Sequence, residues 1–255
     1  MTTPTIEQIY RHVSVRKYKE DPVPNEMIGT IVAASQRSST SSNLQVWTVV
    51  AVTEKSKRAR LMELCGNQKH ILQAPVFLAW CADLSRLDRV SALLGYEQIA
   101  GYVENFIITS MDAAIAMQTA ALAAESLGLG MCYIGAIRNN PREVINLLEL
   151  PELVFPVCGM TVGWPDESPL QKPRLPLEAI LHWESYGVEG EEALLRKYDQ
   201  EIIATGIYGD RQVPVPGKEG ETRQFGWMER SAKKVSRPLR VQLSDILAEQ
   251  GFELK

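Results

Sequence analysis

The chain has few of the residues on which several common kinds of site depend. Only four of its 255 residues are cysteines, and no two of them are spaced as Cys-x-x-Cys. A disulfide framework and a cysteine-based metal site are therefore not expected. The chain has three histidines (His12, His70 and His182), which leaves little room for histidine-based catalysis. We find no pair of catalytic acids and no credible triad, and we expect no metal site.

The sequence also lacks an excess of positive charge and an apolar leader. Its net charge is −4 and its isoelectric point is about 5.6, which argues against a nucleic-acid partner. The first twenty residues contain no apolar segment of the kind that signal peptides carry. The most apolar stretch, 106–129, includes Asp112, Gln118 and Glu125, so it predicts a buried helix rather than a membrane span. We therefore expect a cytoplasmic protein with no membrane partner.

The sequence does contain regular apolar patterns, which alternate between helical and extended spacing. Helical patterns begin at Thr5, which forms a predicted capping box with Gln8, and recur at 27–32, after Thr53, at 104–126 and after Asn140. Runs rich in valine and aromatic residues predict strands at 46–52, 74–83, 131–137 and 154–164. The second run is apolar throughout, which is typical of a central strand. These patterns predict an α+β core with helices on both sides of one sheet.

The character of the chain changes after Trp164. Residues 165–180 are rich in proline, and residues 208–224 are polar with several glycines and prolines, which predicts a long mobile loop. We expect a single domain over 1–255. Its core would span 1–163, and 164–255 would form an excursion with a mobile loop and a C-terminal arm.

Two segments in the first part of the chain are rich in hydrogen-bond donors. "RHVSVRKY" (11–18) places His12, Ser14 and Arg16 at a helix end, where they form either a phosphate clamp or an ordinary solvated helix terminus. "RSSTSSNLQ" (37–45) carries five hydroxyls and two amides between a helix and a core strand. Hydroxyls both donate and accept, so this loop suits a polyol or a phosphate better than it suits a flexible linker.

Three further segments are ambiguous when each is taken alone. "GNQKH" (66–70) could be a polar helix cap, and "QKPRLP" (171–176) could be a surface pair of cations. "GLGMCYIGAIRNNP" (128–141) follows a helix, so its order is wrong for a dinucleotide fingerprint. Its glycines, Gly128, Gly130 and Gly135, could admit a flat ring close to the backbone, or could be a helix cap and a strand bulge. Five such segments without a reactive side chain suggest that a cofactor carries the reaction.

These segments resemble a known family. "SVRKY", "SSTSSNLQ", "GNQKH", "AAESLGLGMCYIGAIRNN" and "KPRLP" occur in the same order in group A oxygen-insensitive NADPH nitroreductases and the related NADPH-dependent FMN reductases. The resemblance covers about residues 5–176. It implies an α+β nitroreductase-like fold with a central, mostly antiparallel sheet flanked by helices. It also implies a homodimer with FMN at its interface and a C-terminal arm that wraps around the partner.

The resemblance also implies which residues contact the cofactors. The FMN set is His12, Ser14, Arg16, Ser39, Thr40, Ser41, Gln45, Gln68, Tyr133, Ile134, Gly135, Ala136, Lys172 and Arg174. Candidates for NADPH are Arg211, Lys218 and Arg223, in a segment longer than the corresponding loop of the family. Two other departures are Val13, where many members have arginine, and Ala136, where they have a second glycine. Loss of that arginine would weaken FMN binding unless Lys17 replaces it.

The implied function is an NAD(P)H-dependent flavin oxidoreductase or nitroreductase with no catalytic side chain of its own. Hydride would pass from NADPH, or NADH, to FMN and then to a nitroaromatic or quinone by a ping-pong mechanism. One alternative is a flavin reductase that releases reduced flavin to a partner enzyme. Another is a non-catalytic FMN-binding protein, and the least specific is an α+β dimer without a cofactor.

Overall fold

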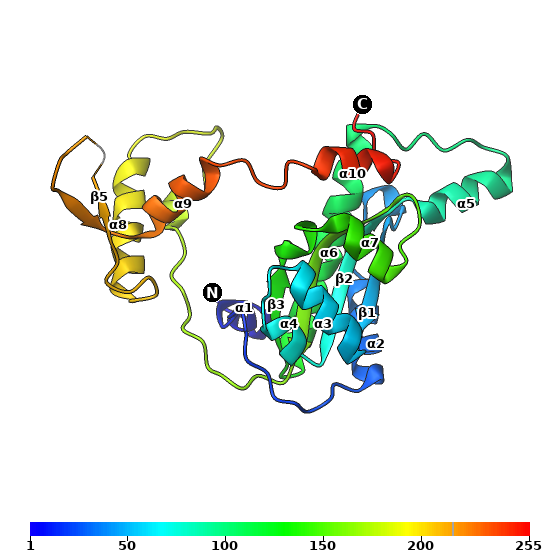
Figure 1. The fold of residues 1–255 in the computed structure, drawn as a ribbon, viewed down its shortest axis with the longest axis horizontal. Helices are drawn as coiled ribbons and strands as arrows, with labels where there is room; N and C mark the ends of the chain where they lie inside the picture. The colour runs from blue at the N-terminus through cyan, green and yellow to red at the C-terminus, as the bar shows by residue number, and fades with distance from the viewer. Residues whose placement is uncertain (216) are drawn as a thin grey trace. The chain divides into compact units, whose positions relative to one another are not determined.

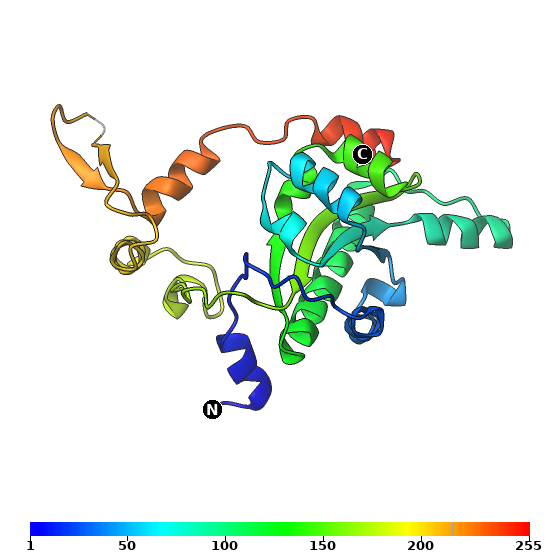
Figure 2. The same cartoon turned by 60° about the horizontal axis from the view of Figure 1, so that its bottom comes forward.

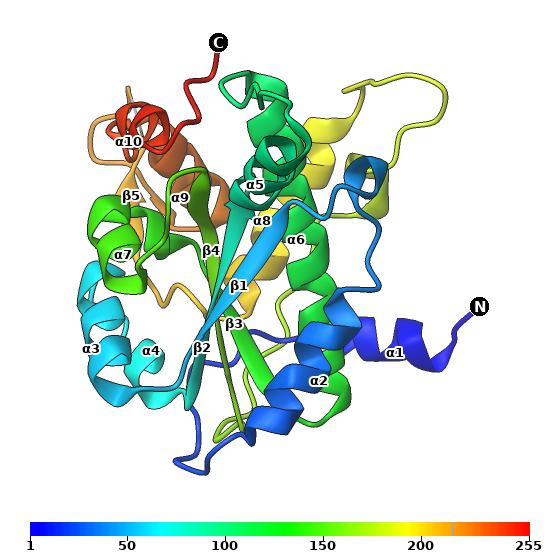
Figure 3. The same cartoon turned by 90° about the vertical axis from the view of Figure 1, so that its right-hand side faces the viewer.

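In the computed structural model, a four-stranded antiparallel sheet lies at the centre of the part of the chain formed by residues 1–169 and 240–255 (Figures 1 and 3). The strand order is β1 (Trp47–Val52), β2 (Val76–Asp83), β4 (Val154–Gly163) and β3 (Gly130–Ile134). Every residue of β2 is buried and the strand lies between β1 and β4, which confirms the prediction of a central strand. The edges of the sheet are therefore β1 and β3.

The side chains of the sheet alternate between two helical layers, as strand geometry requires. On one face, Leu78 and Trp80 pack with α2 (Asn25–Ser35) and α6 (Val103–Ser126). On the other face, Phe77 and Ala79 pack with α3 (Lys55–Leu64), α4 (His70–Gln73) and α7 (Pro141–Leu148). Figure 3 shows the sheet between these layers. The predicted α+β fold with helices flanking the sheet is confirmed.

The structure describes residues 1–215 and 217–255, which form two compact units. The first unit contains Met1–Pro169 and Arg240–Lys255, and the second contains Leu170–Leu239. The chain thus leaves the first unit close to the predicted end of the core and later returns to it. The single domain and the partner-embracing arm stay predictions.

The returning segment contains α10 (Leu243–Glu249), which lies beside α7 in the first unit (Figure 2). Arg142 and Glu249 form an ion pair at 2.5 Å between the two helices, and the Leu153 amide donates to the Gln250 carbonyl at 2.9 Å. Ile246, Leu247 and Phe252 are buried here. The segment 240–255 is therefore built into the core of the first unit.

Helix α6 is the longest helix and has two different faces. Ala116, Ala120, Ala121 and Ala124 are buried in the core, where their small side chains let the helix approach the sheet closely. By length and composition alone α6 could cross a membrane, but this alanine face belongs to the protein core. The opposite face is apolar and exposed. We call it the α6 stripe, and it consists of Val103, Ile107, Met111 and Ile115.

The second unit is small and has few buried side chains. It contains the 3₁₀ helix η3 (Leu177–Ala179), α8 (Glu191–Ala204), the hairpin strands β5 (Gln212–Pro214) and β6 (Thr222–Gln224), and α9 (Trp227–Val235). Tyr198 and Trp227 pack edge to face between α8 and α9. The sequence predicted a long mobile loop over 208–224. Within the described residues of this range, β5 pairs with β6 and Val213 is buried.

Other local predictions differ from the structure. Helix α1 (Pro4–Tyr10) is capped by Thr3 instead of Thr5, and the Gln8 amide donates to the Leu122 carbonyl instead of closing a capping box. The predicted strand 131–137 ends at Ile134, where the 3₁₀ helix η2 (Gly135–Arg138) begins. Thr53 does not cap α3. Helices α5 (Ser85–Leu94) and α8 were not predicted from the sequence.

Candidate functional site

The first group of predicted site residues lies along the β3 edge of the sheet. The segment 12–16 runs beside β3, where Ser14 pairs with Met131 and the Val15 amide donates to the Met131 carbonyl at 2.9 Å. His12 Nδ1 lies 2.5 Å from Glu125 Oε1 on α6. With Glu125 ionised, Nδ1 carries the proton, so Nε2 is left as the nitrogen that can meet a ligand.

Arg16 presents a guanidinium group at this edge. Its backbone amide donates to Glu167 Oε1 at 2.6 Å, and its side chain contacts only the Ser14 carbonyl, at 3.4 Å. The side chain is exposed and has no ion pair with any residue in 1–215 or 217–255. A guanidinium without a carboxylate partner, held at its backbone, is suited to bind an anion such as a phosphate.

Gln68 and His70 lie at the start of α4, near Arg16. Gln68 Nε2 donates to the Cys65 carbonyl at 2.8 Å, which leaves its Oε1 available. His70 is only 8% exposed, and its Nε2 has no hydrogen-bond partner among the described residues. Burial, together with the nearby charge of Arg16, lowers the pKa of His70, so the ring is neutral at pH 7. The sequence analysis did not select His70.

The three glycines of 128–141 have three different roles. Gly128 has φ +80° and ends α6, where the left-handed conformation favours glycine. A Cβ on Gly130 would lie 2.6 Å from Val15 Cγ2, so this glycine allows the N-terminal segment to approach β3. A Cβ on Gly135 would meet only Arg138 Nη2, at 3.5 Å. Gly128 thus has the helix-cap role that the sequence allowed, Gly130 makes room for Val15, and a side chain at Gly135 would be in ordinary contact with Arg138.

The residues around Gly135 form the end of β3. The Tyr133 hydroxyl donates to Gln118 Oε1 at 2.8 Å, and burial raises the pKa of this phenol, which therefore stays protonated. Ile134 is buried in the core, and Ala136 packs against the same cluster. The segment thus offers backbone groups, and not reactive side chains, to a neighbouring molecule.

The second group of predicted residues lies at the opposite, β1 edge. Thr40, Ser41 and Gln45 belong to the loop before β1, which includes the 3₁₀ helix η1 (Ser41–Asn43). The Ser41 amide donates to Asp112 Oδ1 at 2.9 Å, and the Thr40 hydroxyl donates to Asp112 Oδ2. Ser39 is exposed. The loop therefore presents hydroxyls outward from a base that is fixed on α6.

The two groups are not adjacent within one chain. Both are anchored on α6, the first through Glu125 and the second through Asp112. These positions are thirteen residues apart, which is about 20 Å along a helix axis. A hydrogen bond spans only about 3 Å. Within one chain, the two groups of predicted residues therefore do not form a single binding site.

Lys172 and Arg174 belong to the second unit. Both are exposed, and Arg174 Nη1 donates to the Lys172 carbonyl at 3.0 Å. Their position relative to Arg16 is not defined by the structure, so their role toward FMN stays a prediction.

The candidates for NADPH separate into paired and unpaired cations. Lys218 forms an ion pair with Glu221 at 3.0 Å, and Arg223 forms one with Glu229. Arg211 instead lies over the Phe225 ring at 4.4 Å and lines a cavity of ≈ 580 Å³ in the second unit. The other cations of this cavity, which we call the α9 pocket, are Arg230, Lys233, Lys234 and Arg237.

The arrangement at the β3 edge fits a phosphorylated flavin in three respects. It offers an unpaired guanidinium at Arg16, an unpartnered buried nitrogen at His70, and a glycine at position 135 that has no side chain to keep a ring from the backbone. A metal ion has no comparable site, since no group of three or more candidate ligands lies together within 1–215 and 217–255. The donor set is therefore that of an anion and a flat ring.

Comparison with known proteins shows the family to which the chain belongs. The nitroreductase family model matches residues 9–164, and the model of the nitroreductase family C-terminal domain matches residues 172–255. The chain belongs to the nitroreductase family. It is 38% identical over 253 residues to "FMN reductase [NAD(P)H]" of Bacillus subtilis, and the match covers 98% of each chain. It is 34% identical over 250 residues to "Oxygen-insensitive NADPH nitroreductase" of Salmonella typhimurium, again over 98% of each chain.

A solved structure of this nitroreductase family has the same fold. The NADPH:FMN oxidoreductase from Vibrio harveyi, complexed with NAD+, superposes with a TM-score of 0.87 at 33% identity. The superposition covers 99% of this chain and all of the other. The resemblance that the sequence motifs indicated is confirmed over the whole chain.

Four functional candidates of this family member escaped the sequence analysis. Asp112 and Glu125 stood out only as polar residues within an apolar helix, and the cations of α9 only as a basic run. His70 is part of the quoted "GNQKH" segment but was not selected. The contacts that distinguish them join residues far apart in the chain, such as His12 with Glu125.

Proposed function

We propose that the chain is an FMN-dependent oxidoreductase that transfers a hydride from NADPH to a small electron-poor acceptor, such as a nitroaromatic or a quinone. The observation that carries the proposal is the unpaired Arg16 guanidinium on the segment that holds His12 and Ser14 and pairs with β3, in a chain of the nitroreductase family. When bound, FMN supplies the ring that accepts and returns the hydride, which no side chain of this site can do.

The side chains of the site bind and orient the cofactor in this proposal. Arg16 and Ser14 hold the phosphate, and His12 donates or accepts through Nε2 while Glu125 fixes its ring. Gly135 has no side chain, which lets a flat ring approach the backbone. The donor and the acceptor occupy the same face in turn, so the kinetics are ping-pong.

The site is completed by a second copy of the chain. The residues at the β1 edge and those at the β3 edge lie about 20 Å apart along α6, and the exposed α6 stripe lies on the same helix. If two α6 helices pack antiparallel across this stripe, the Asp112 end of one faces the Glu125 end of the other. That arrangement would bring Ser39, Thr40 and Ser41 of one copy to the Arg16 group of its partner, and it removes an apolar surface from water.

NADPH is the proposed electron donor because of the α9 pocket. Four of its cations, Arg211, Arg230, Lys234 and Arg237, have no carboxylate partner among the described residues, whereas Lys233 pairs with Glu229. Unpaired cations stabilise the extra phosphate that distinguishes NADPH from NADH. The apolar surface of Phe225 in the same cavity suits the adenine ring.

The visible spectrum of the purified protein tests this function. We expect a yellow protein whose flavin absorbance bleaches under anaerobic conditions with NADPH, and more slowly with NADH. Initial-rate plots with menadione or nitrofurazone should then give parallel lines. A protein that stays colourless after incubation with FMN would contradict the proposal. A yellow protein that oxidises neither nucleotide would instead be a non-catalytic flavin-binding protein.

The second candidate function is a flavin reductase that releases reduced flavin to a partner enzyme. Val13, which stands where many family members have arginine, packs against the small cluster of Val15, Tyr18 and Ala74. It therefore adds no donor for a phosphate. Lys17 does not replace it, because Lys17 lines a different cavity with Arg58 and Asp166. Loss of the flavin during gel filtration, with activity restored by free FMN, would favour this alternative.

A cytoplasmic location is part of the proposal. All four cysteines are buried and unpaired, and burial raises the pKa of Cys65 to about 12. Free thiols of this kind persist in a reducing compartment.

A further inference from the structure

Asp112 is a buried carboxylate in the middle of α6. It is 2% exposed and forms no ion pair with any residue in the described parts of the chain. Burying a carboxylate without a cation is unfavourable unless hydrogen bonds replace its hydration. Here the hydrogen bonds come from residues 37–45, the loop before β1, which we call the β1-edge loop. The Ser41 amide donates to Oδ1 at 2.9 Å, and the Thr40 hydroxyl donates to Oδ2.

The loop that Asp112 holds has an unusual backbone. Ser42, Asn43 and Gln45 have φ of 48°, 58° and 53°, which side chains other than glycine rarely adopt. The Gln45 amide donates to the Thr40 hydroxyl oxygen at 2.8 Å. A single hydroxyl thus connects Asp112 to both ends of the strained segment, accepting from Gln45 while it donates to the carboxylate.

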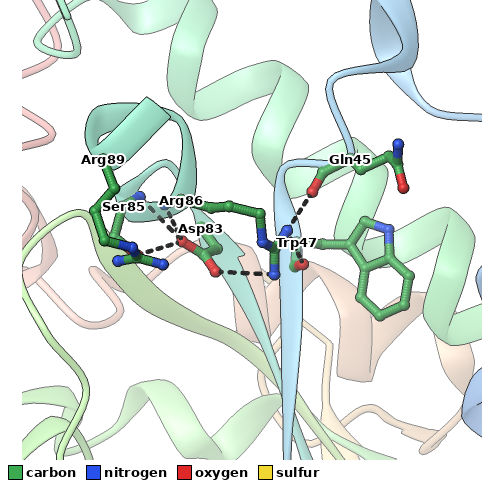
Figure 4. A network of polar contacts seen from close by, with 6 residues as sticks. All are labelled: Gln45, Trp47, Asp83, Ser85, Arg86 and Arg89. Carbon is green, nitrogen blue, oxygen red and sulfur yellow. Dashed lines mark hydrogen bonds and ion pairs between the residues drawn. The ribbon is translucent and has the colours of Figure 1, made fainter. Parts of the chain in front are cut away.

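Three further hydrogen bonds fix the two ends of the loop. Arg86 Nη1 donates to the Gln45 carbonyl at 2.7 Å and to the Trp47 carbonyl at 3.4 Å, and Arg86 is itself oriented by Asp83 (Figure 4). At the start of the loop, the Ser38 hydroxyl donates to Thr119 Oγ1 on α6 at 2.7 Å. The contacts to α6 and Arg86 hold the base of the loop, whereas the hydroxyls of Ser39, Ser41 and Ser42 have no hydrogen bond to a described residue.

We propose that Asp112 is a positioning residue for flavin binding: it holds the β1-edge loop in its strained form, so that the hydroxyls of Ser39 and Ser41 face the polyol and phosphate of FMN. The proposal rests on the proposed function. Holding the loop before binding lowers the conformational entropy that is lost when the ligand is bound. Asp112 itself does not contact the flavin.

The first test compares flavin fragments on the full-length protein. In Asp112→Asn, the dissociation constants of FMN and riboflavin should rise about tenfold or more, because the loop loses a charge-assisted anchor. The dissociation constant of lumiflavin, which lacks the polyol chain, should stay within about twofold. Equal weakening of all three ligands, or no weakening of FMN, would overturn the proposal.

Thr109→Val is the matched control. Thr109 is also buried on α6, but its hydroxyl donates only to carbonyls of its own helix, at 2.7 and 3.1 Å. This variant should bind FMN like the wild type. If it weakens FMN as much as Asp112→Asn does, the effect belongs to α6 in general and the proposal fails.

A double-mutant cycle tests the named contact and does not depend on a single variant folding well. Thr40→Val removes the hydroxyl that joins Asp112 to Gln45, so adding Asp112→Asn to it should cost little more. Thr40→Ser keeps the hydroxyl and should recover most of the FMN affinity. Additive effects of the two substitutions would show that they act separately, against the proposal.

Amide hydrogen exchange in the flavin-free protein separates this inference from the proposed function. The Ser41 and Gln45 amides should exchange at least about tenfold faster in Asp112→Asn, since their acceptors are lost or released. If the wild type binds no flavin, the proposed function fails, and faster exchange would still show that Asp112 holds the loop. Unchanged exchange would overturn the positioning role even in a protein that binds FMN.

Discussion

The two edges of the sheet carry different kinds of donor. The β3 edge presents a cation and an imidazole, Arg16 and His12, whereas the loop at the β1 edge presents hydroxyls and amides, and the nearby Arg86 is held by Asp83. Each edge is anchored by a carboxylate of α6, Glu125 for the first and Asp112 for the second. One helix therefore supports both groups of predicted site residues.

This difference indicates how the two edges contribute to binding. A charge acts over several ångströms and attracts an anion before contact, whereas a hydroxyl acts only at hydrogen-bond distance and in one orientation. The cationic side chain at the β3 edge can therefore act while it is exposed to solvent and able to move, and Arg16 is exposed. The β1 edge needs a fixed backbone, and its loop is held at both ends. Four experiments probe this comparison, from the largest expected effect to the smallest.

Separating the two edges should have the largest effect. Ile115→Glu places a carboxylate in the α6 stripe, where a second copy would bury it at high cost. We expect a monomer by analytical ultracentrifugation and a loss of FMN affinity of about a hundredfold or more, since each copy keeps half a site. Ala33→Glu, on the exposed face of α2, is the control and should stay dimeric. A monomeric variant that retains FMN would show that one edge is sufficient.

Removing the charge from the β3 edge should come next. Arg16→Gln should weaken FMN about 10- to 100-fold, the range expected for a charge-assisted hydrogen bond, with little effect on riboflavin. Lys17→Gln removes the adjacent cation, which lines another cavity, and should change FMN binding less than twofold. Calorimetric titration measures both variants. Equal losses in the two would mean that general positive charge, and not the placement of Arg16, attracts the phosphate.

Releasing the imidazole from its carboxylate should have a smaller effect. In Glu125→Gln the partner of His12 Nδ1 loses its charge, so the ring is less fixed, and we expect FMN to bind about three- to tenfold more weakly. Glu104→Gln, exposed on the same helix, serves as the control. Unchanged binding in Glu125→Gln would place His12 outside the phosphate site.

The smallest expected effect concerns stability rather than binding. The pKa of His70 is lowered in the folded state, mainly by burial, so the unfolded chain takes up a proton at a higher pH than the folded protein does. The free energy of unfolding should therefore fall as the pH drops from 7 to 5. His70→Gln should show a weaker fall in urea titrations of the flavin-free protein, whereas His182→Gln should behave like the wild type. An equal fall in His70→Gln would assign the pH dependence to other groups.

Much of the fold could be predicted from the sequence. The four strands and the helices α2, α3, α6 and α7 follow apolar periodicity, because side chains on a strand or helix face repeat at fixed spacing. Helix α8 and the β5–β6 hairpin could not be predicted in this way. The second unit has few buried side chains, and its two strands are only three residues long, too short to show an alternating pattern.

The sequence by itself determined the family, the apolar core and the donor-rich segments, because these depend on residue type and local spacing. Only the tertiary structure decided that the segments lie at opposite edges of the sheet, that Gly130 makes room for Val15, and that Asp112 accepts hydrogen bonds from the β1-edge loop. Each of these facts depends on a contact between residues more than seventy positions apart. Local spacing does not encode such contacts, since they exist only after the helices and strands have packed together.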